Sequence, residues 1–191
     1  MKLVTINLHS YIEEQSEKKL NDFVEAVCKI APDVIAMQEV NQRTESKEIS
    51  DSLITNQFGI RMKADNYGLR IARKLLRKGQ KYHLFWVGIK NGYKVFDEGL
   101  CFLSKAPALS SEAFNISKTE DSSDWRKRMA LGIKIDDVWF YNVHMGRWDD
   151  EKEPFLKQWE IFEKRIKDKE NIWILGDFNA PSDAVGEGYD L

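Results

Sequence analysis

Short apolar runs of strand type alternate along this chain with segments of helical periodicity, and this alternation restricts the fold to the α/β class. Residues 34–37 form a continuous apolar run, which is typical of a strand covered on both faces. The segment 13–31 before it carries apolar side chains at helical spacing and ends at Pro32, so it predicts a helix. By the same criteria the other expected helices are 69–76 and 155–166, and the other expected strands are 3–8, 82–89, 99–104, 129–135, 138–143 and 172–175.

Turn signals and polar stretches complete this outline. The pair Asn91-Gly92 predicts a hairpin turn between two strands, and Asp136-Asp137 predicts a second hairpin. Residues 41–64 are polar and weakly patterned, and residues 110–124, which are rich in Ser, Asp and Glu, predict a polar loop. The chain contains no repeat, low-complexity tract or linker, and residues 1–191 are therefore expected to form a single domain.

The composition indicates a folded protein of a reducing compartment. Hydrophobic residues make up 42% of the 191 residues and charged residues 31%, which excludes an intrinsically disordered chain. The N-terminal residues lack the apolar stretch of a signal peptide, and no run approaches the roughly 18–20 apolar residues of a membrane span. Cys28 and Cys101 lie in apolar segments and are interpreted as reduced core residues. We therefore expect a cytoplasmic protein without a transmembrane segment.

The charge balance restricts the partners. The formal net charge of −2 excludes a protein that is held to nucleic acid by bulk positive charge. Two local basic stretches, 70–78 and Arg126-Lys127-Arg128, either bind nucleic acid or form solvated surfaces balanced by acids elsewhere. Trp86, Trp125 and Trp148 likewise offer either stacking surfaces or partly buried packing.

Polar side chains gather where the apolar strands end. Because corresponding strand ends lie at one edge of the sheet in layered α/β folds, these side chains are expected to converge. Carboxylates, amides and an imidazole brought together would bind a hard divalent cation and a phosphate. Each group taken alone also fits a solvated loop residue, a structural histidine or a turn. The groups are Asn7 with His9, Gln38-Glu39, His144 and Gly176-Asp177-Phe178-Asn179.

Three further motifs belong to the same pattern, namely Glu98-Gly99-Leu100, Leu103-Ser104 and Asn142-Val143. In content and order, the whole set resembles the motifs of the endonuclease/exonuclease/phosphatase superfamily. This superfamily includes DNase-I-like nucleases, abasic-site endonucleases, neutral sphingomyelinases and inositol-polyphosphate phosphatases. The resemblance extends over essentially the whole chain. Asn7-Leu8-His9-Ser10 and Trp148-Asp149-Asp150 are also similar to a bacterial branch that is accessory to a two-component regulator of fibrinogen binding. The resemblance implies a four-layer α/β sandwich, with two facing mixed β-sheets and helices outside.

The resemblance also implies metal-assisted hydrolysis of a phosphate ester. Glu39 would be the principal ligand of Mg²⁺, with Mn²⁺ as a substitute, and Asn7 would support it. Asp177 would orient or activate the attacking water. These roles agree with the preference of Mg²⁺ for a few oxygen ligands and several waters. A zinc site is excluded, because the cysteines are isolated and the three histidines are dispersed.

Four further residues would contact the phosphate or position the groups that do. By resemblance, Asn179 would donate a hydrogen bond to a phosphoryl oxygen as charge builds up there. His144 would also contact the phosphate, and Glu98 would lie within hydrogen-bond reach of His144, orient its ring and raise its pKa. Arg128 would clamp the phosphate, with Arg126 as the alternative because the register is open.

The chain departs from the family pattern after Asn179. The pattern continues with another aspartate and an Asp-His pair, and none of His9, His83 and His144 occupies that position. We expect a C-terminally truncated domain, with a natural remnant that binds without turnover as the alternative. The missing strands would leave an apolar sheet edge through which copies of the chain could associate.

Two functions of different classes therefore remain open. The first is a divalent-metal-dependent phosphodiesterase, nuclease or phosphatase. The second is a catalytically silent regulatory or nucleic-acid-binding module of the same fold. The net charge of −2 disfavours a general DNase, and the sequence does not choose among DNA, a nucleotide, a phospholipid and a sugar phosphate as the substrate of the enzyme.

The departure after Asn179 predicts that the chain retains metal binding but loses most of its hydrolytic activity. A lost hydrogen-bond donor to the transition state costs about 10²–10³-fold, and a lost general acid or base about 10²–10⁴-fold. We therefore expect the 191-residue chain to hydrolyse phosphate esters at least about 10³-fold more slowly than a protein extended by the family's C-terminal segment. A side-by-side assay of the two proteins on one ester checks this, and equal turnover would contradict the assignment.

Overall fold

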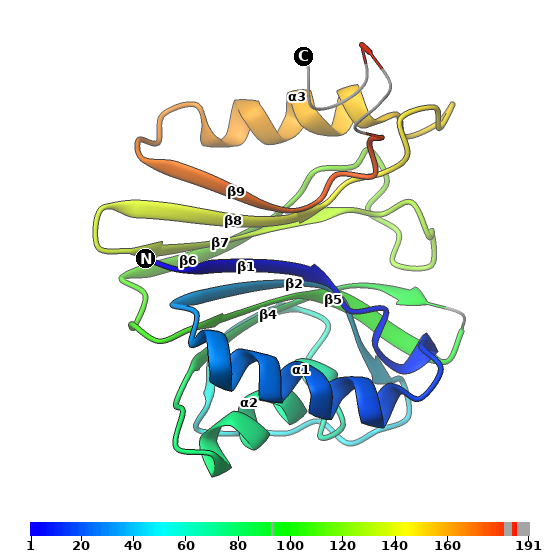
Figure 1. Cartoon of the computed structure of the whole chain (residues 1–191). Coiled ribbons are helices and arrows are strands. Elements are labelled where there is room, and N and C mark those ends of the chain that lie inside the picture. Colours follow the sequence, from blue (N-terminus) through cyan, green and yellow to red (C-terminus); the bar gives the residue numbers. More distant parts are fainter. Residues whose placement is uncertain (93, 182–184, 187–191) are drawn as a thin grey trace.

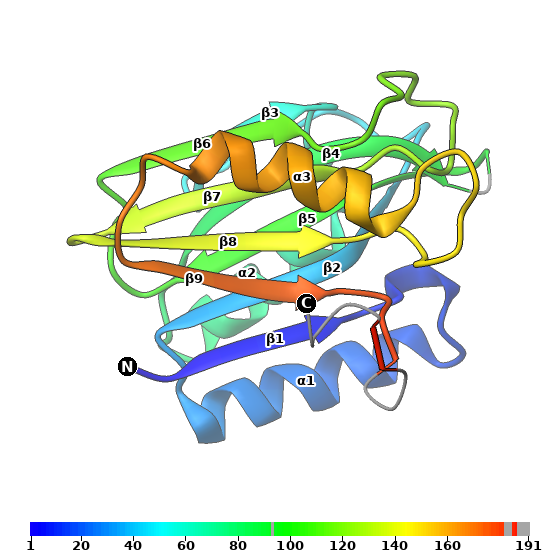
Figure 2. The ribbon, with the colours of Figure 1, turned by 90° about the horizontal axis from the view of Figure 1, so that it is seen from above.

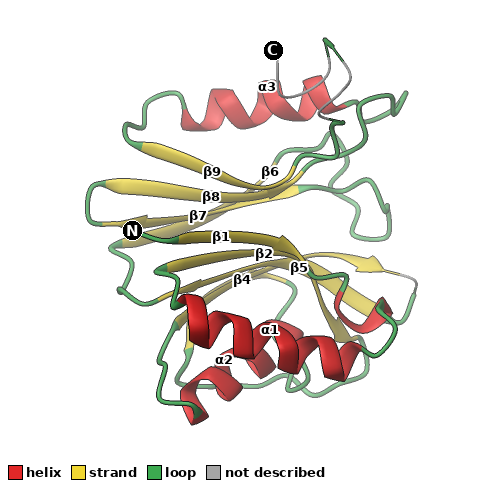
Figure 3. Ribbon diagram, viewed as in Figure 1, coloured by secondary structure: helices red, strands yellow, loops and turns green. Residues whose placement is uncertain are grey.

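The molecule is a sandwich of two β-sheets with helices on both outer faces (Figure 1). The computed structural model describes residues 1–92, 94–181 and 185–186. Figure 3 shows two helices beneath one sheet and a third helix above the other, so the layers run helix, sheet, sheet, helix. The four-layer α/β sandwich expected from the sequence is therefore confirmed. Among the described residues, no helix has the length and apolarity needed to cross a bilayer.

The first sheet has five strands in the order β1-β2-β5-β4-β3. The pairs at its two edges, β1 with β2 and β3 with β4, are parallel, and the inner pairs are antiparallel. A short 3₁₀ helix, η1, follows β1, and two α-helices cover the outer face. The bounds are β1 Leu3–Asn7, η1 Ser10–Ile12, α1 Ser16–Ile30, β2 Val34–Arg43, β3 Ile54–Gly59, α2 Tyr67–Arg77, β4 His83–Gly92 and β5 Phe96–Ser104.

The second sheet has four strands in the order β6-β7-β8-β9, and only β8 and β9 are parallel. One helix, α3, covers its outer face. The bounds are β6 Ser110–Asn115, β7 Met129–Ile135, β8 Val138–His144, α3 Phe155–Ile166 and β9 Ile172–Asp177. The edge strands β1 and β9 lie near each other on one side of the sandwich (Figure 2). Association of copies through this side stays a prediction.

Local sequence signals account for the helix ends. The chain turns out of α1 at Ala31, which adopts a left-handed conformation just before Pro32. At the start of α2 the side chain of Asn66 accepts a hydrogen bond from the backbone N–H of Leu69, as an N-cap residue does. Gly79, with φ of +78°, allows the chain to leave α2 without steric cost. These signals explain why the predicted helices are confirmed to within a few residues.

Three apolar layers hold the sandwich together. The first lies between α1, α2 and the first sheet, the second between the two sheets, and the third between the second sheet and α3. Strands β2, β4 and β5 contribute side chains to both faces of the first sheet, which explains their continuous apolar runs. Each layer contains many completely buried aliphatic and aromatic side chains, so burial of apolar surface is the main stabilising contribution.

The structure corrects the loop expected at 110–124 and adds a strand within the weakly patterned stretch 41–64. Strand β3 lies inside the stretch 41–64, and strand β6 lies inside the stretch 110–124. Both are edge strands whose side chains are mostly half-buried or exposed, so they carry polar residues and lack an apolar pattern. The hairpin between β4 and β5 also differs, since Asn91 and Gly92 belong to β4 and pair with Asp97 and Phe96.

A buried amide on β8 joins the two sheets. The Asn142 Nδ2 donates to the backbone oxygens of Met37, on β2, and Cys101, on β5, at 3.0 and 3.1 Å. Its Oδ1 accepts a hydrogen bond of 2.7 Å from the Gln38 Nε2. All four residues are nearly or completely buried, so no water competes for these groups. This amide therefore sets the position of the second sheet relative to β2.

Replacing this amide should weaken the fold. We expect Asn142→Leu to lower the free energy of unfolding by about 2–4 kcal/mol, because it leaves several buried polar groups unpaired. Urea denaturation followed by circular dichroism measures the change. Asn56→Leu is the control, since Asn56 is exposed and its hydrogen bond to Ser111 lies at the surface. Equal stability of the two variants would contradict the role given to Asn142.

Candidate active site

Glu39 lies on a β-bulge inside β2. The ladder with β5 pairs Met37 with Cys101 and resumes at Val40 with Gly99, so Gln38 and Glu39 have no direct partner on β5. Glu39 has φ of +50°, a left-handed conformation that is uncommon outside glycine. The sequence predicted that the strand ends at Met37, and this is wrong. An inserted residue shifts the alternation of side chains, so Glu39 leaves the core face while the strand continues.

Ser10 on η1 holds this bulge from outside the sheet. Its Oγ donates a hydrogen bond of 2.5 Å to the backbone oxygen of Glu39 and accepts one of 3.3 Å from the backbone N–H of Asn41. Ser10 is completely buried. The loop that follows β1 therefore stabilises the unusual backbone of Glu39.

Four of the predicted site residues meet, three at the ends of β1, β8 and β9 and Glu39 at the bulge inside β2. The Asn7 Nδ2 lies 2.9 Å from the Glu39 Oε1 and 2.9 Å from the Asp177 Oδ2. The His144 Nε2 lies 4.0 Å from the Glu39 Oε1 and 3.9 Å from the Asp177 Oδ2. Asn7 and Glu39 come from the first sheet, and His144 and Asp177 are paired neighbours on β8 and β9. The structure thus brings Asn7, Glu39, His144 and Asp177 together, while their individual roles stay predictions.

Asn179 lies beside this group and orders the loop that carries it. Its backbone N–H donates to the Asp177 Oδ1 at 3.0 Å, and its Nδ2 donates to the Met145 backbone oxygen at 2.8 Å. An amide nitrogen has two hydrogens, so the second remains available for a phosphoryl oxygen. Asn179 therefore links the loops after β8 and β9.

The charge of Glu98 acts to raise the pKa of His144, as expected, but the hydrogen bonding of Glu98 differs from the expectation. Its Oε1 pairs with the Nζ of Lys90 at 3.1 Å, and no hydrogen bond among the described residues joins it to His144. Lys90 is a neighbour of Glu98 in the β4–β5 ladder and is also buried, so it competes successfully for the carboxylate. Sequence reasoning missed Lys90, although a lysine inside an otherwise apolar strand-like run is a usable signal.

Arg128, and not Arg126, is the arginine of this site. Arg128 is only 6% exposed, and its Nη1 donates to the backbone oxygens of Trp125 and Lys127 at 2.8 and 3.0 Å. Its Nε is buried and has no hydrogen-bond partner among the residues that the structure describes. Arg126 pairs instead with Asp150, 3.0 Å away. Arg128 also interacts electrostatically with Glu98, Glu39 and Asp177, which favours it over Arg126, and its role as a phosphate clamp stays a prediction.

Burial determines the protonation of the titratable groups. It lowers the pKa of His144 to about 4, helped by the positive charge of Arg128 and opposed by the carboxylate of Asp177, so the imidazole is neutral at pH 7. Burial also lowers the pKa of Lys90, which the carboxylate of Glu98 opposes. The same effect lowers the pKa of Arg128, but a guanidinium stays charged in proteins.

The residues present fit a hard divalent cation. No three His, Cys, Asp or Glu side chains of the described residues form a ready-made metal cluster. Mg²⁺ needs only one or two carboxylates and keeps several waters, and Glu39 and Asp177 both contact the Asn7 amide. The orphaned Nε of Arg128 and the unpartnered side-chain amide of completely buried Asn41 are polar groups that call for an additional ligand or ordered water.

A cleft of 940 Å³ opens beside the carboxylates. Asn7 and Asp177 line its polar end, and Phe155, Trp159 and Phe178 line its apolar part beneath α3. Glu39 and His144 are not among its lining residues, so the cleft adjoins the polar group from one side and does not cover it.

The basic helix α2 forms a charge-balanced surface. Arg73 pairs with Asp51 at 2.7 Å, Lys74 with Glu17 at 3.4 Å, and Arg70 also pairs with Glu17. This favours the solvated-surface interpretation of stretch 70–78 over a nucleic-acid site.

Comparison with known proteins identifies the fold. No protein-family model and no curated protein matches the chain. Among solved structures, an endonuclease/exonuclease/phosphatase family protein from Leptotrichia buccalis matches with a TM-score of 0.80 and 23% identity, over 94% of this chain and 66% of that one. The chain therefore has the fold of the endonuclease/exonuclease/phosphatase superfamily.

Two structures of known activity share this fold. A 3'-5' exonuclease from Neisseria meningitidis matches with a TM-score of 0.58 and 18% identity, over 96% of this chain and 60% of that one. A mannosyl-6-phosphatase from Bacteroides thetaiotaomicron matches with a TM-score of 0.56 and 13% identity, over 97% of this chain and 67% of that one. The chain thus spans less than two thirds of the length of the Leptotrichia and Neisseria proteins.

The support of the bulge by Ser10 generates a prediction. We expect Ser10→Ala to lower the free energy of unfolding by about 1–3 kcal/mol, because the Oγ makes two hydrogen bonds in the interior. It should also weaken Mg²⁺ binding, since Glu39 loses the contact that holds its backbone. Urea denaturation and calorimetric titration with Mg²⁺ measure the two effects. Ser110→Ala, at an exposed position on β6, is the control. Unchanged values for Ser10→Ala would contradict the prediction.

Proposed function

We propose that this chain is the site-bearing part of a divalent-metal-dependent hydrolase of phosphate esters. The observation that carries the proposal is the meeting of Asn7, His144 and Asp177, at strand ends of both sheets, with Glu39 on the bulge of β2. The shared fold with an exonuclease and a sugar phosphatase is consistent with it.

The charges around the site favour a bound divalent cation. Three carboxylates, those of Glu39, Glu98 and Asp177, face two buried cations, Lys90 and Arg128, while His144 is neutral. The resulting excess of one negative charge would repel a phosphate. A divalent cation reverses the sign of this excess and makes the site attractive to an anionic ester.

The site residues would have different roles around that cation. Glu39 would hold the metal together with Asn7, which contacts both carboxylates. Bound Mg²⁺ or Mn²⁺ supplies Lewis-acid stabilisation of the phosphoryl oxygens. Asp177, a carboxylate that is partly exposed, would orient the attacking water and accept its proton.

The remaining polar groups would stabilise the charge on the phosphoryl oxygens. Neutral His144 can donate one hydrogen bond from its ring without carrying charge. The second hydrogen of the Asn179 amide and the unpartnered Nε of Arg128 are further donors. Positioned donors of this kind each contribute about 10²–10³-fold to the rate of such reactions.

Conservative substitutions of the two carboxylates test the proposal. We expect Glu39→Gln and Asp177→Asn each to lower hydrolysis by at least about 10²-fold, because each removes a negative charge needed for the metal or for the water. Glu160→Gln, on the exposed face of α3, is the control. The assay is a panel of a phosphomonoester, a phosphodiester, an oligodeoxynucleotide, a sugar phosphate and a phospholipid, with Mg²⁺, with Mn²⁺ and with EDTA.

Two results would contradict the proposal. Turnover that survives Glu39→Gln would place the chemistry in other residues. Metal binding that depends on Glu39, without turnover of any ester by this chain or by a C-terminally extended protein, would identify a silent binding module of the same fold.

A further inference from the structure

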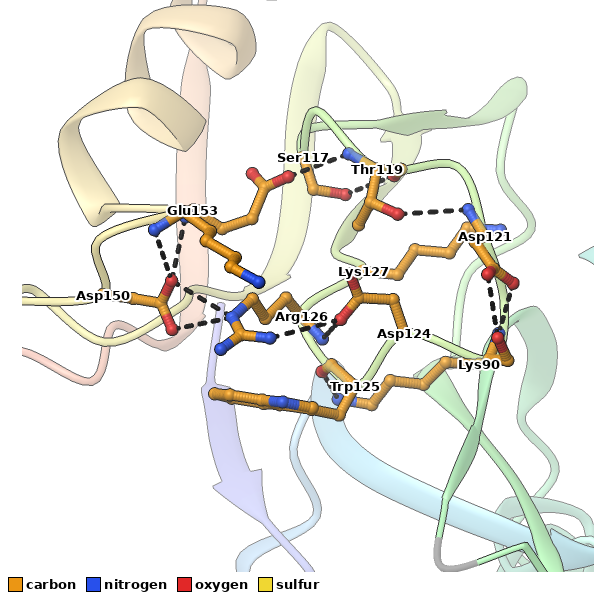
Figure 4. Close-up of polar contacts among 12 residues, drawn as sticks. Lys90, Ser117, Thr119, Asp121, Asp124, Trp125, Arg126, Lys127, Asp150 and Glu153 are labelled. Carbon is orange, nitrogen blue, oxygen red and sulfur yellow. Dashed lines mark hydrogen bonds and ion pairs between the residues drawn. The ribbon is translucent and has the colours of Figure 1, made fainter.

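An exposed tryptophan stands at the rim of the candidate active site. Trp125 lies in the segment between β6 and β7, three residues before Arg128 (Figure 4). It is 50% exposed, which is unusual for so large an apolar side chain. The segment after His144 carries Arg147 and Asp150 and borders the same region. Both segments therefore extend directly from site residues.

The backbone of Trp125 is attached to the two buried cations of the site. Its carbonyl oxygen accepts hydrogen bonds from the Lys90 Nζ at 2.9 Å and from the Arg128 Nη1 at 2.8 Å. Lys90 in turn pairs with Glu98. The backbone of Trp125 is thus fixed to the two buried cations of the site, while its indole side chain takes no part in these bonds.

One face of the indole ring is already covered. The guanidinium of Arg126 lies over the Trp125 ring, 4.4 Å from its centroid. Arg126 is itself fixed, because its Nε donates to both carboxylate oxygens of Asp150 at 3.2 and 3.0 Å (Figure 4). No other ring or cation among the described residues stacks on Trp125, and half of the residue's surface is exposed.

The space beside the ring has the size and polarity for a planar heterocycle. A hollow of 330 Å³ lies against Trp125, Arg126 and Arg147. Its lining contains three cationic and three carboxylate side chains, so it does not select for a second phosphate. It instead offers donors and acceptors to a neutral ring with polar edges.

The other exposed tryptophan lacks these features. Trp173 is 56% exposed and lies on β9, four residues before Asp177. Four residues of a strand span about 13 Å, which places Trp173 away from the candidate site. Trp148 and Trp159 are partly buried and pack against Phe155. Among these tryptophans, Trp125 alone combines an exposed side chain with backbone hydrogen bonds to the buried cations of the site.

We infer that Trp125 is the stacking surface for a nucleobase of the substrate, so that the esters hydrolysed are those of nucleotides or of single-stranded nucleic acid. This inference rests on the proposed function and names its substrate class. A half-exposed indole ring that is supported on one face by a guanidinium is suited to stack on unpaired bases. A sugar phosphate or a phospholipid offers no planar ring to this surface.

A matched pair of substrates tests the inference. One is a short oligothymidylate, and the other has the same backbone with abasic tetrahydrofuran residues in place of the bases. Stacking of one base on an aromatic side chain is worth about 5- to 150-fold in affinity. We therefore expect Trp125→Ala to weaken binding of the oligothymidylate by about 5-fold or more and to leave the abasic strand unaffected. Trp125→Phe should retain most of the affinity, and Trp173→Ala should change neither strand.

Binding and hydrolysis are measured separately. Calorimetric titration of the Asp177→Asn protein with each strand reports binding alone, and KM and kcat of the unsubstituted protein report hydrolysis. An equal loss on both strands in Trp125→Ala would show that the ring only supports the loop, and equal binding of the two strands by the parent protein would also overturn the inference. Base-dependent binding without any hydrolysis would instead contradict the proposed function alone.

Discussion

The buried amide of Asn142 is the contact on which the candidate site depends. It hydrogen-bonds the backbone of β2 and β5 at the point where their ladder is interrupted, and it fixes Gln38 next to Glu39. The same strand, β8, ends two residues later in His144. One side chain therefore aligns a sheet edge that carries Asn7 and Glu39 with a sheet edge that carries His144 and Asp177. Apolar packing between the sheets is strong but non-directional, and it could not set this register alone.

The bulge at Glu39 shows how the fold accommodates a functional residue inside a core strand. A regular strand would place side chains alternately into two apolar layers, with no route to the sheet edge. The inserted residue lets β2 continue to Arg43 while the Glu39 carboxylate reaches Asn7. The cost is a left-handed backbone at a residue with a side chain, and the buried hydrogen bonds of Ser10 offset it. Function and stability are thus coupled at one position.

Buried charge gives the site its chemical character. Lys90 and Arg128 are both deeply buried, and each is held close to carboxylates that it cannot fully neutralise. The charge of a divalent cation would balance the excess of carboxylates. The remaining hydrogen-bond donors of the protein would then bind the oxygens of an anionic ester. The segment that carries Trp125 is connected to these buried charges. The carbonyl oxygen of Trp125 accepts hydrogen bonds from Lys90 and Arg128, and the guanidinium of Arg126 stacks on the Trp125 ring.

The sequence by itself determined the α/β class and, within the described part of the chain, all three α-helices and seven of the nine strands, because these elements are long, strongly periodic or continuously apolar. It also located Asn7, Glu39, His144 and Asp177, since polar residues that follow buried strands leave a visible pattern. Edge strands β3 and β6 escaped detection because their half-exposed side chains carry no apolar period. Only the tertiary structure decided that Glu39 sits on a bulge, that Glu98 pairs with Lys90, and that Arg128 rather than Arg126 faces the site. These outcomes depend on the distances between side chains of strands that are far apart in the sequence, because such side chains compete for the same carboxylate or backbone group. The order of residues along the chain does not give these distances.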